Sequence, residues 1–434
     1  PGGFVPREGS DSPPGQRRVL WHLLGLICLW GAVYLPYAGA PEWHYEEARR
    51  AVPAREMIAS GDWVQPTLFG HTYLNKPPLY MWAVAAASQI VGAVNPWSTR
   101  WPSLLGTLLG AWVVLAFARR ALHPRAGLWA GAFYLLTWQT FDTGRLGEIE
   151  GLFGPLVLAA VCALWWAPVS WGAALLAASA LGAALLAKGP PALLYLVAAY
   201  LGLAWVRGRS IWKRPSTWAP LVLGLVPVAI WAALLLQEVP MDQVLGRWGG
   251  ELQRAGDGGL QAYASDRLRF VAGVVLGFFP ASWLVIGALA SRRKEPLGEA
   301  HRYLLASLGL ALLLFALPVG TRPRYAFPAL GLAALCAGQV VAELRDRNQR
   351  FRSLAAWRPV AVMCGVLGLG LLVAVLLTPQ VDLLQAGLPR GIAWVPLAVA
   401  AASGAVALRM GLSPLRRDFL PLALLTLAAG RIFQ

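Results

Sequence analysis

Apolar runs about as long as a bilayer is thick recur along this chain, and they restrict the fold to a bundle of membrane-spanning helices. A spanning helix needs about 20 mainly apolar residues, and it satisfies its own backbone hydrogen bonds, as the bilayer interior requires. With 57% hydrophobic and 13% charged residues among 434, the composition is typical of a polytopic membrane protein. We therefore predict an all-α integral membrane protein with about 13 transmembrane helices. The predicted spans are 19–37, 100–118, 126–143, 151–167, 171–187, 190–206, 216–236, 270–290, 302–318, 326–342, 358–377, 391–408 and 418–431.

Short basic clusters between these runs predict the topology. Positive residues favour the cytoplasmic side of a membrane protein, and one alternating arrangement with a cytoplasmic N-terminus places nearly every cluster there. The net charge of +16 then needs no nucleic-acid partner. Most acidic residues fall on the opposite, extracytoplasmic side. The cytoplasmic clusters are Arg17 and Arg18, Arg119 to Arg125, Arg207 to Arg214, Arg292 to Lys294, Arg345 to Arg352, and Arg409 to Arg417.

The chain is predicted to contain a single folded domain. Residues 1–18 are rich in Gly, Pro and Ser and are expected to be a disordered cytoplasmic N-terminus. Residues 19–431 then form the transmembrane domain. The residues after the last predicted span are too few for a C-terminal soluble domain, so none is expected in this chain.

The extracytoplasmic loop 38–99 has the densest pattern of charges. Charged side chains beside a bilayer are costly and usually functional. The first part of the stretch from Glu46 to Trp82 suggests an amphipathic helix that ends at Gly61, with Ala48, Ala51, Val52, Arg55 and Ile58 at i, i+3, i+4 spacing. The Lys76-Pro77-Pro78 segment is expected to form an extended turn. The apolar run 79–93 is too short to span, so we place it as a helix on the membrane surface, and we interpret loop 38–99 as a catalytic loop.

Carboxylates and cations are predicted to meet on this side of the membrane. A carboxylate can take a proton from an attacking hydroxyl, and cations can hold a phosphate, which together suit an anionic lipid substrate. The candidate residues are Glu46, Glu47 and Arg49, Lys76, Glu148 and Glu150, Lys188, and Arg322, Arg324 and Tyr325.

Each candidate also has a structural alternative. Glu46 could simply pair with Arg50 one helical turn away. Lys76 and Lys188 could extend to the membrane interface, Arg322 and Arg324 could contact lipid headgroups, and the two carboxylates at 148 and 150 could be structural. His44 and His71 lie beside carboxylates without the close spacing of metal ligands, so a divalent metal is left open and no cofactor is assigned.

The stretch EEARRAVPAREMIASGDWVQPTLFGHTYLNKPPLYMW resembles one family closely. It is similar to the bacterial polyprenyl-phosphate-dependent glycosyltransferases of the aminoarabinose (lipid A) transferase and protein O-mannosyltransferase superfamily, which have the GT-C fold. Further resemblances are NPWSTRWPSLLG, GRLGEIE, LLAKGP and RPRYAFPAL, so that the similarity covers residues 19–345. The aminoarabinose transferases also carry a periplasmic domain after the last span, and this sequence ends where that domain would begin.

The resemblance implies roles for individual residues. Glu46 matches the first acidic residue of the family's pair, its candidate base, and Glu150 matches the second acidic site; both positions are usually Asp. Lys76 matches the phosphate-binding lysine, and Arg324 and Tyr325 match an element near the lipid phosphate. Glu47 is kept as a third catalytic candidate. The lipid-phosphate ligands are then expected among Lys76, Arg49, Lys188, Arg322, Arg324 and Tyr325.

The function implied is the transfer of a sugar from a polyprenyl monophosphate, such as undecaprenyl phosphate, with inversion. The acceptor would be a hydroxyl or phosphate on a lipid, glycan or protein, as in lipid A or cell-envelope modification. The reaction would occur on the periplasmic face of a multi-pass protein in the bacterial inner membrane. A transporter, flippase or binding protein for the same anionic lipids is the alternative. A transporter should show inverted repeats and broken helices, and the sequence indicates neither.

Overall fold

The computed structural model describes residues 14–41, 45–244, 260–290, 297–318 and 321–346. The predicted spans at 358–377, 391–408 and 418–431, the cluster at Arg292 to Lys294, and His44 lie outside the described residues. Within the described part the regular elements are helices, except for one antiparallel hairpin of two strands with two residues each. The elements are α1 (Pro14–Tyr34), η1 (Leu35–Tyr37), α2 (Tyr45–Ser60), β1 (Thr67–Leu68), β2 (His71–Thr72), α3 (Leu79–Val91), α4 (Pro96–Ala121), α5 (Ala126–Leu136), α6 (Trp138–Gly144), α7 (Ile149–Leu164), η2 (Ala167–Val169), α8 (Trp171–Lys188), α9 (Pro191–Arg207), η3 (Arg209–Lys213), α10 (Pro215–Glu238), α12 (Leu260–Gly277), α13 (Ala281–Ala290), α14 (Glu299–Ala316), η4 (Pro323–Ala326) and α15 (Ala329–Asp346).

The all-helical membrane class predicted from the sequence is confirmed. Four described helices, α4, α8, α10 and α14, are long and apolar enough to cross a membrane, and several shorter apolar helices accompany them. Local sequence explains their ends. The Asn95 side chain accepts a hydrogen bond from the Ser98 backbone N–H, and the Ser98 hydroxyl accepts one in return, so a reciprocal cap starts α4. The first helix, α1, begins at Pro14. Residues 14–18 are therefore helical, whereas the sequence analysis predicted them to be disordered.

Two predicted spans are each divided into two helices, which corrects the sequence-based assignment. The segment 126–143 is interrupted at Thr137, which has an extended backbone between α5 and α6. The segment 270–290 is interrupted before Pro280, between α12 and α13. At the first break, the Thr137 hydroxyl caps the end of α5 by donating to the Phe133 carbonyl. At the second break, Pro280 has no N–H to donate, which favours the end of a helix.

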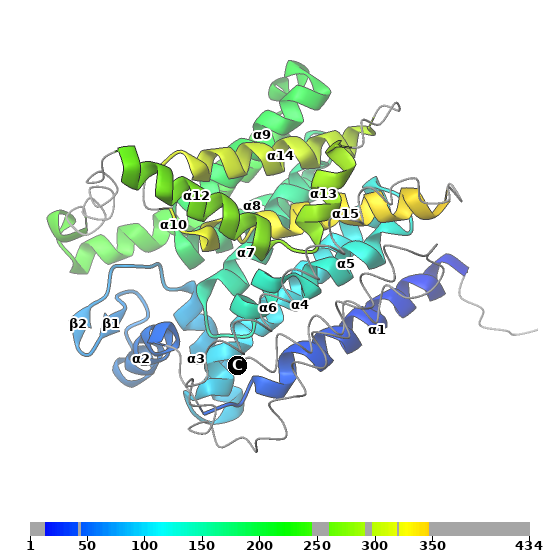
Figure 1. The fold of residues 1–434 in the computed structure, drawn as a ribbon. Helices are drawn as coiled ribbons and strands as arrows, with labels where there is room; N and C mark the ends of the chain where they lie inside the picture. The colour runs from blue at the N-terminus through cyan, green and yellow to red at the C-terminus, as the bar shows by residue number, and fades with distance from the viewer. Residues whose placement is uncertain (1–13, 42–44, 245–259, 291–296, 319–320, 347–434) are drawn as a thin grey trace, which may run out of the picture.

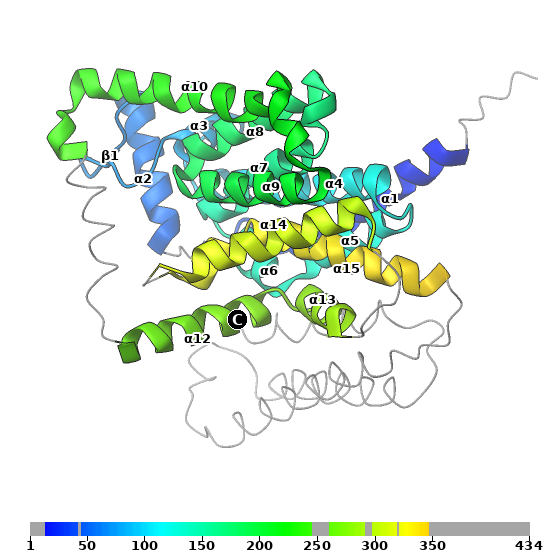
Figure 2. The same cartoon turned by 90° about the horizontal axis from the view of Figure 1, so that it is seen from above.

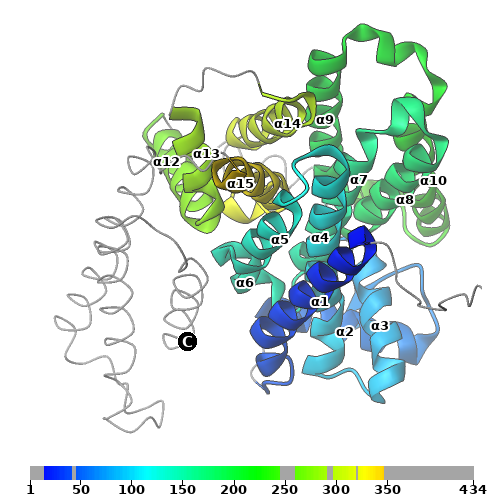
Figure 3. The ribbon, with the colours of Figure 1, turned by 90° about the vertical axis from the view of Figure 1, so that its right-hand side faces the viewer.

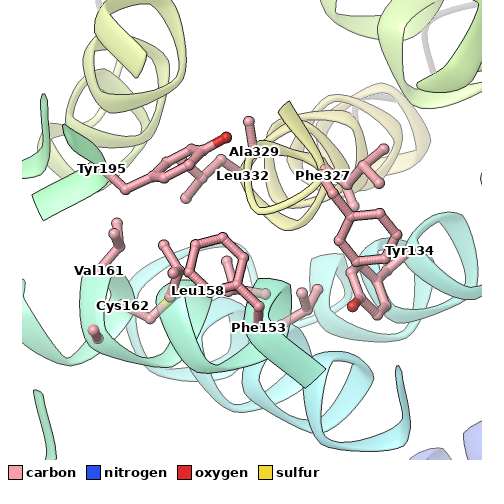
Figure 4. Packing of buried hydrophobic residues seen from close by; sticks show 14 of the residues in the cluster. Tyr134, Phe153, Leu158, Val161, Cys162, Tyr195, Phe327, Ala329 and Leu332 are labelled. Carbon is pink, nitrogen blue, oxygen red and sulfur yellow. The ribbon is translucent and has the colours of Figure 1, made fainter. Parts of the chain in front are cut away.

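Helices α4 and α7 pack closely because glycines face each other where they meet. A Cβ on Gly106 of α4 would collide with the Gly151 carbonyl of α7, and a Cβ on Gly151 would lie 2.6 Å from the Ser103 Cβ. Beyond this contact, aromatic and aliphatic side chains of α5, α7, α9, α15 and the residues just before α15 fill the core, as Figure 4 shows for Tyr134, Phe153 and Phe327.

The first loop lies at one end of the helical bundle. In Figures 1 and 2, α2, α3 and the hairpin gather at the end opposite the start of α1, and in the view of Figure 3 α2 and α3 lie below α7, α8 and α10. Helix α9 spans about 25 Å at 1.5 Å per residue, which carries the basic residues from Arg207 onward away from the end near Lys188. There Arg207 donates to the Trp165 carbonyl and lies over the Trp165 ring, in a tryptophan-rich region typical of a membrane interface.

Candidate active site

Helix α2 turns its charged residues inward. Its buried face includes Glu46, Glu47 and Arg50. The predicted face is correct only in part, because Ala51 is buried whereas Arg55 and Ile58 are exposed. The buried charges are paired with one another and with other elements, so ion pairs hold α2 to the bundle together with apolar contacts of Ala51, Ala54 and Met57.

Glu46 is surrounded by arginines. Its Oε2 accepts a hydrogen bond from Arg50 at 3.2 Å, and its Oε1 lies 3.7 Å from Arg49 and 3.8 Å from Arg324. Arg50 also donates to the Tyr73 hydroxyl at 2.8 Å. The Glu46–Arg50 pair considered as a structural alternative therefore exists. The contact with Arg324 also joins two segments that are far apart in the sequence, so the loop 38–99 and the segment after α14 lie at the same end of the bundle, as predicted.

Glu150 sits in the first turn of α7 and pairs with Lys188 at the end of α8. The Lys188 Nζ donates to Glu150 Oε1 at 2.8 Å and lies 4.7 Å from the Tyr325 ring centre and 5.2 Å from that of Phe153. Lys188 is buried, so it is not an interfacial anchor. Its charge is balanced by the carboxylate and by the negative faces of two aromatic rings.

Arg324 connects the two carboxylates. Its Nε lies 3.8 Å from Glu150 Oε1, while its Nη1 lies 3.8 Å from Glu46. Both distances are longer than hydrogen bonds, and the side chain is 32% exposed, so the guanidinium retains capacity for another anion. The backbone around it is held firmly, because Tyr195 donates to the Tyr325 carbonyl at 2.7 Å and Gln139 donates to the Pro323 carbonyl at 3.3 Å.

Glu148 precedes α7, where its backbone carbonyl accepts a hydrogen bond from Ser103 at 2.6 Å. Burial and the neighbouring Glu150 carboxylate raise the pKa of Glu148 to about 7, against a smaller opposing effect of Arg324. The side chain therefore exchanges its proton near neutral pH, next to the charged cluster.

Lys76 lies in the turn between β2 and α3 and is partly buried. The turn rests against the Lys188 end of α8, because a Cβ on Gly189 would come 3.9 Å from Pro77 Cγ. Arg322 is exposed and makes none of the ion pairs of the cluster that the described residues show. No group of three metal-ligating side chains occurs among the described residues, and His71 is exposed on β2.

Sequence analysis missed one buried charge near this cluster. Arg100 of α4 is 3% exposed and pairs with Glu47. The signal was present, because an arginine within a predicted span is costly unless a carboxylate or carbonyl accompanies it. Glu47 is thus occupied by Arg100, while Glu46 beside it joins the Arg324 cluster.

The fold and the cluster together define a class: a polytopic helical membrane protein with paired carboxylates and cations at the end that carries its first loop. Residues 75–232 match the family described as dolichyl-phosphate-mannose-protein mannosyltransferase. The undecaprenyl phosphate-alpha-4-amino-4-deoxy-L-arabinose arabinosyl transferase of Edwardsiella ictaluri is 28% identical over 353 residues, covering 79% of this chain and 62% of that protein. The corresponding transferase 2 of Sodalis glossinidius is 29% identical, covering 75% of this chain and 60% of that protein. The chain thus spans about three-fifths of the length of these relatives.

Solved structures show the same fold. ArnT from Cupriavidus metallidurans, bound to undecaprenyl phosphate, aligns with a TM-score of 0.70 at 19% identity over 95% of this chain and 75% of that one. The archaeal oligosaccharyltransferase AglB from Archaeoglobus fulgidus aligns with a TM-score of 0.51 at 12% identity over 79% of this chain and 52% of that one. The resemblance predicted from the motifs is confirmed: the chain has the GT-C membrane fold and is similar to the ArnT-type transferases.

Proposed function

We propose that this protein is a membrane glycosyltransferase that moves a sugar from a polyprenyl-monophosphate carrier to a hydroxyl or phosphate on a lipid, glycan or protein. The observation that carries the proposal is the position of Arg324, a partly exposed cation between Glu46 and Glu150. A cation that bridges two carboxylates without a close hydrogen bond to either can be recruited by a phosphate. The names of the relatives support undecaprenyl phosphate as the carrier.

The geometry supports an inverting reaction with Glu46 as the base. The acceptor oxygen attacks the anomeric carbon, the bond from that carbon to the phosphate oxygen breaks, and the lipid phosphate leaves with the electron pair. Glu46 takes the acceptor proton. Arg324, Lys76 and Arg49 balance the charge on the departing phosphate, which needs no strong acid. Glu150 keeps Lys188 and Arg324 in place.

Donor binding would also free one side of Glu46. Its carboxylate is within 4 Å of three arginines, one of which is the partly exposed Arg324. When the donor phosphate attracts Arg324, the Glu46 oxygen that faced it can accept a hydrogen bond from the acceptor hydroxyl. Binding of the acceptor at the base is thereby coupled to the presence of the donor.

The site is proposed to face the periplasm of the bacterial inner membrane. Helices α4 and α9 lead away from the cluster, and basic residues lie at or just after their far ends, at Arg119, Arg120 and Arg207 to Arg214. Positive residues favour the cytoplasmic side of a membrane protein. The acceptor would therefore be a component of the outer leaflet or of the periplasm.

Release of the carrier lipid tests the proposal. Purified protein in lipid nanodiscs is incubated with a labelled polyprenyl-phosphate sugar and a mixture of envelope lipids and glycans. We expect free polyprenyl phosphate and a labelled acceptor to form together, and Glu46→Gln to form neither at a comparable rate. Tight donor binding, or passage of the donor across the membrane, without release of polyprenyl phosphate would contradict the transferase function and support the lipid-transport or binding alternative.

A further inference from the structure

Glu47 follows Glu46 on α2 but binds a different set of groups. Its Oε1 accepts hydrogen bonds from the Arg100 Nε at 2.7 Å and from the Gly147 backbone N–H at 2.7 Å. Its Oε2 accepts one from Arg100 Nη2 at 3.0 Å. The carboxylate side chain is 0% exposed and that of Arg100 is 4% exposed. Both oxygens are therefore occupied in a paired, two-pronged contact closed to solvent.

Arg100 extends this contact to the start of the first loop. Its Nη1 donates to the Ala40 carbonyl at 2.9 Å and is 3.4 Å from the Ala38 carbonyl. One guanidinium thus joins α4 to α2 and to the chain that enters α2. We call Glu47, Arg100 and the Gly147 amide the Glu47 clamp.

Gly147 links the Glu47 clamp to the segment that carries Glu150. It lies three residues before Glu150, and a Cβ there would come 2.8 Å from Thr99 Cγ2 and 3.3 Å from Glu47 Cγ, so the close approach requires glycine. The segment is held a second time by Ser103, which donates to the Glu148 carbonyl and shares a hydrogen bond with the Tyr80 hydroxyl at 2.8 Å.

We infer that Glu47 and Arg100 are positioning residues, and that the Glu47 clamp sets the separation of the Glu46 and Glu150 carboxylates so that Arg324 can lie between them. Glu46 is fixed because it is adjacent to Glu47 on one helix, and Glu150 because its segment is bound through Gly147. The inference rests on the proposed transferase function for its activity measurements, and it assigns Glu47 no proton transfer.

Three variants test the clamp: Glu47→Gln, Arg100→Lys and the double variant. The lysine variant is diagnostic, because it leaves the Glu47 carboxylate in place while removing the two-pronged contact. We expect each single variant to slow single-turnover transfer by about tenfold or more, since an error of about 1 Å at a reacting centre costs up to about a hundredfold. The double variant should be no slower than the slower single variant, because both changes break one contact.

Donor binding distinguishes misplacement from general loss of structure. We expect all three variants to bind the labelled donor with full stoichiometry and with affinity within about threefold of the unmodified protein, while turnover falls. Glu56→Gln is the matched control, because Glu56 is a carboxylate on the same helix whose partners among the described residues are Thr67 and Gly70 of the hairpin region. It should retain normal turnover.

Two outcomes would overturn the clamp. If Arg100→Lys turns over normally while Glu47→Gln is inactive, Glu47 itself is a reacting carboxylate. If the effects of the single variants multiply in the double variant, the two residues act separately. Thermal unfolding of the same variants gives a double-mutant cycle that does not depend on activity. If the clamp is one contact, the drop in Tm of the double variant is smaller than the sum of the drops of the two single variants. An unmodified protein that transfers no sugar would contradict the proposed function and leave this unfolding test of the clamp in force.

Discussion

At the scale of single residues, the site is a row of alternating charges, from Arg50 through Glu46, Arg324 and Glu150 to Lys188. Each carboxylate has a cation on both sides, which offsets the cost of burying it. Removing one member leaves its neighbours partly uncompensated. For this reason neutral substitutions of similar size are more informative than alanine at the carboxylates.

Glu46→Gln and Lys76→Ala should affect different steps. The glutamine keeps the size and removes the base, so we expect kcat to fall by about a hundredfold or more with little change in donor affinity. Lys76→Ala should weaken donor binding by about ten- to a hundredfold, the scale of one charge-assisted contact, and also slow turnover. Lys76→Arg should keep only part of the donor affinity and turnover, because a planar guanidinium replaces the compact ammonium charge. Donor affinity and single-turnover rates measure these effects; normal turnover of Glu46→Gln would make Glu46 a structural partner of Arg50.

Glu150→Gln should harm transfer more than Glu148→Gln. Glu150 pairs with both Lys188 and Arg324. The pKa of Glu148 is raised to about 7, so its side chain carries less negative charge near neutral pH and a neutral glutamine changes it less. The comparison is the single-turnover rate of the two variants at one pH. Equal losses, or a loss only in the Glu148 variant, would refute this assignment.

Glu148 should make the protein less stable as the pH rises through about 7. The folded state raises the pKa of this carboxyl from 4.5 to about 7, so it binds the proton more tightly than the unfolded chain does. The resulting stabilisation is complete below pH 4.5 and is lost as the pH rises through 7. We expect the Tm to fall between pH 4.5 and about 7, and Glu148→Gln to reduce that fall. An unchanged pH dependence in the variant would assign the effect to other groups.

At the scale of elements, the contact between α4 and α7 determines where Glu150 lies. Gly106→Ala should force the helices apart, because the added methyl would meet the Gly151 carbonyl. Overpacking of this kind costs about 1–3 kcal/mol, and the shift would also move the first turn of α7. We expect a lower Tm together with slower transfer. Gly309→Ala on α14 is the control, since nothing lies within 4 Å of its added Cβ, and it should lower neither the Tm nor the transfer rate.

At the scale of the whole molecule, the predicted topology places the first loop and the α9–α10 connection on opposite sides of the membrane. Ser60 and Ser210 are both exposed and suit single-cysteine labelling. The native cysteines at positions 28, 162, 336 and 364 are first replaced. An impermeant thiol reagent added to intact cells should label Cys at position 60 and should label Cys at position 210 only after permeabilisation. Labelling of both from one side would contradict the topology.

The sequence by itself determined the class of the protein and most residues of the candidate site. Apolar runs and basic clusters are sufficient for an all-helical membrane chain, because a bilayer admits few other structures and strongly biases the placement of arginine. The motifs also identified Glu46, Glu150, Lys188 and Arg324, which the structure brings into one cluster. These properties depend on local composition and spacing, and a single sequence records both.

The tertiary structure alone decided how neighbouring residues divide their roles. Glu46 and Glu47 are identical in type and adjacent in sequence, yet one meets Arg324 and the other meets Arg100. The breaks at Thr137 and before Pro280, and the inward charged face of α2, also escaped the sequence patterns. For Glu46, Glu47 and the charged face of α2 the deciding partner comes from an element far away along the chain. A side chain's burial and charge balance depend on that partner, and hydrophobic periodicity within one helix contains no information about it.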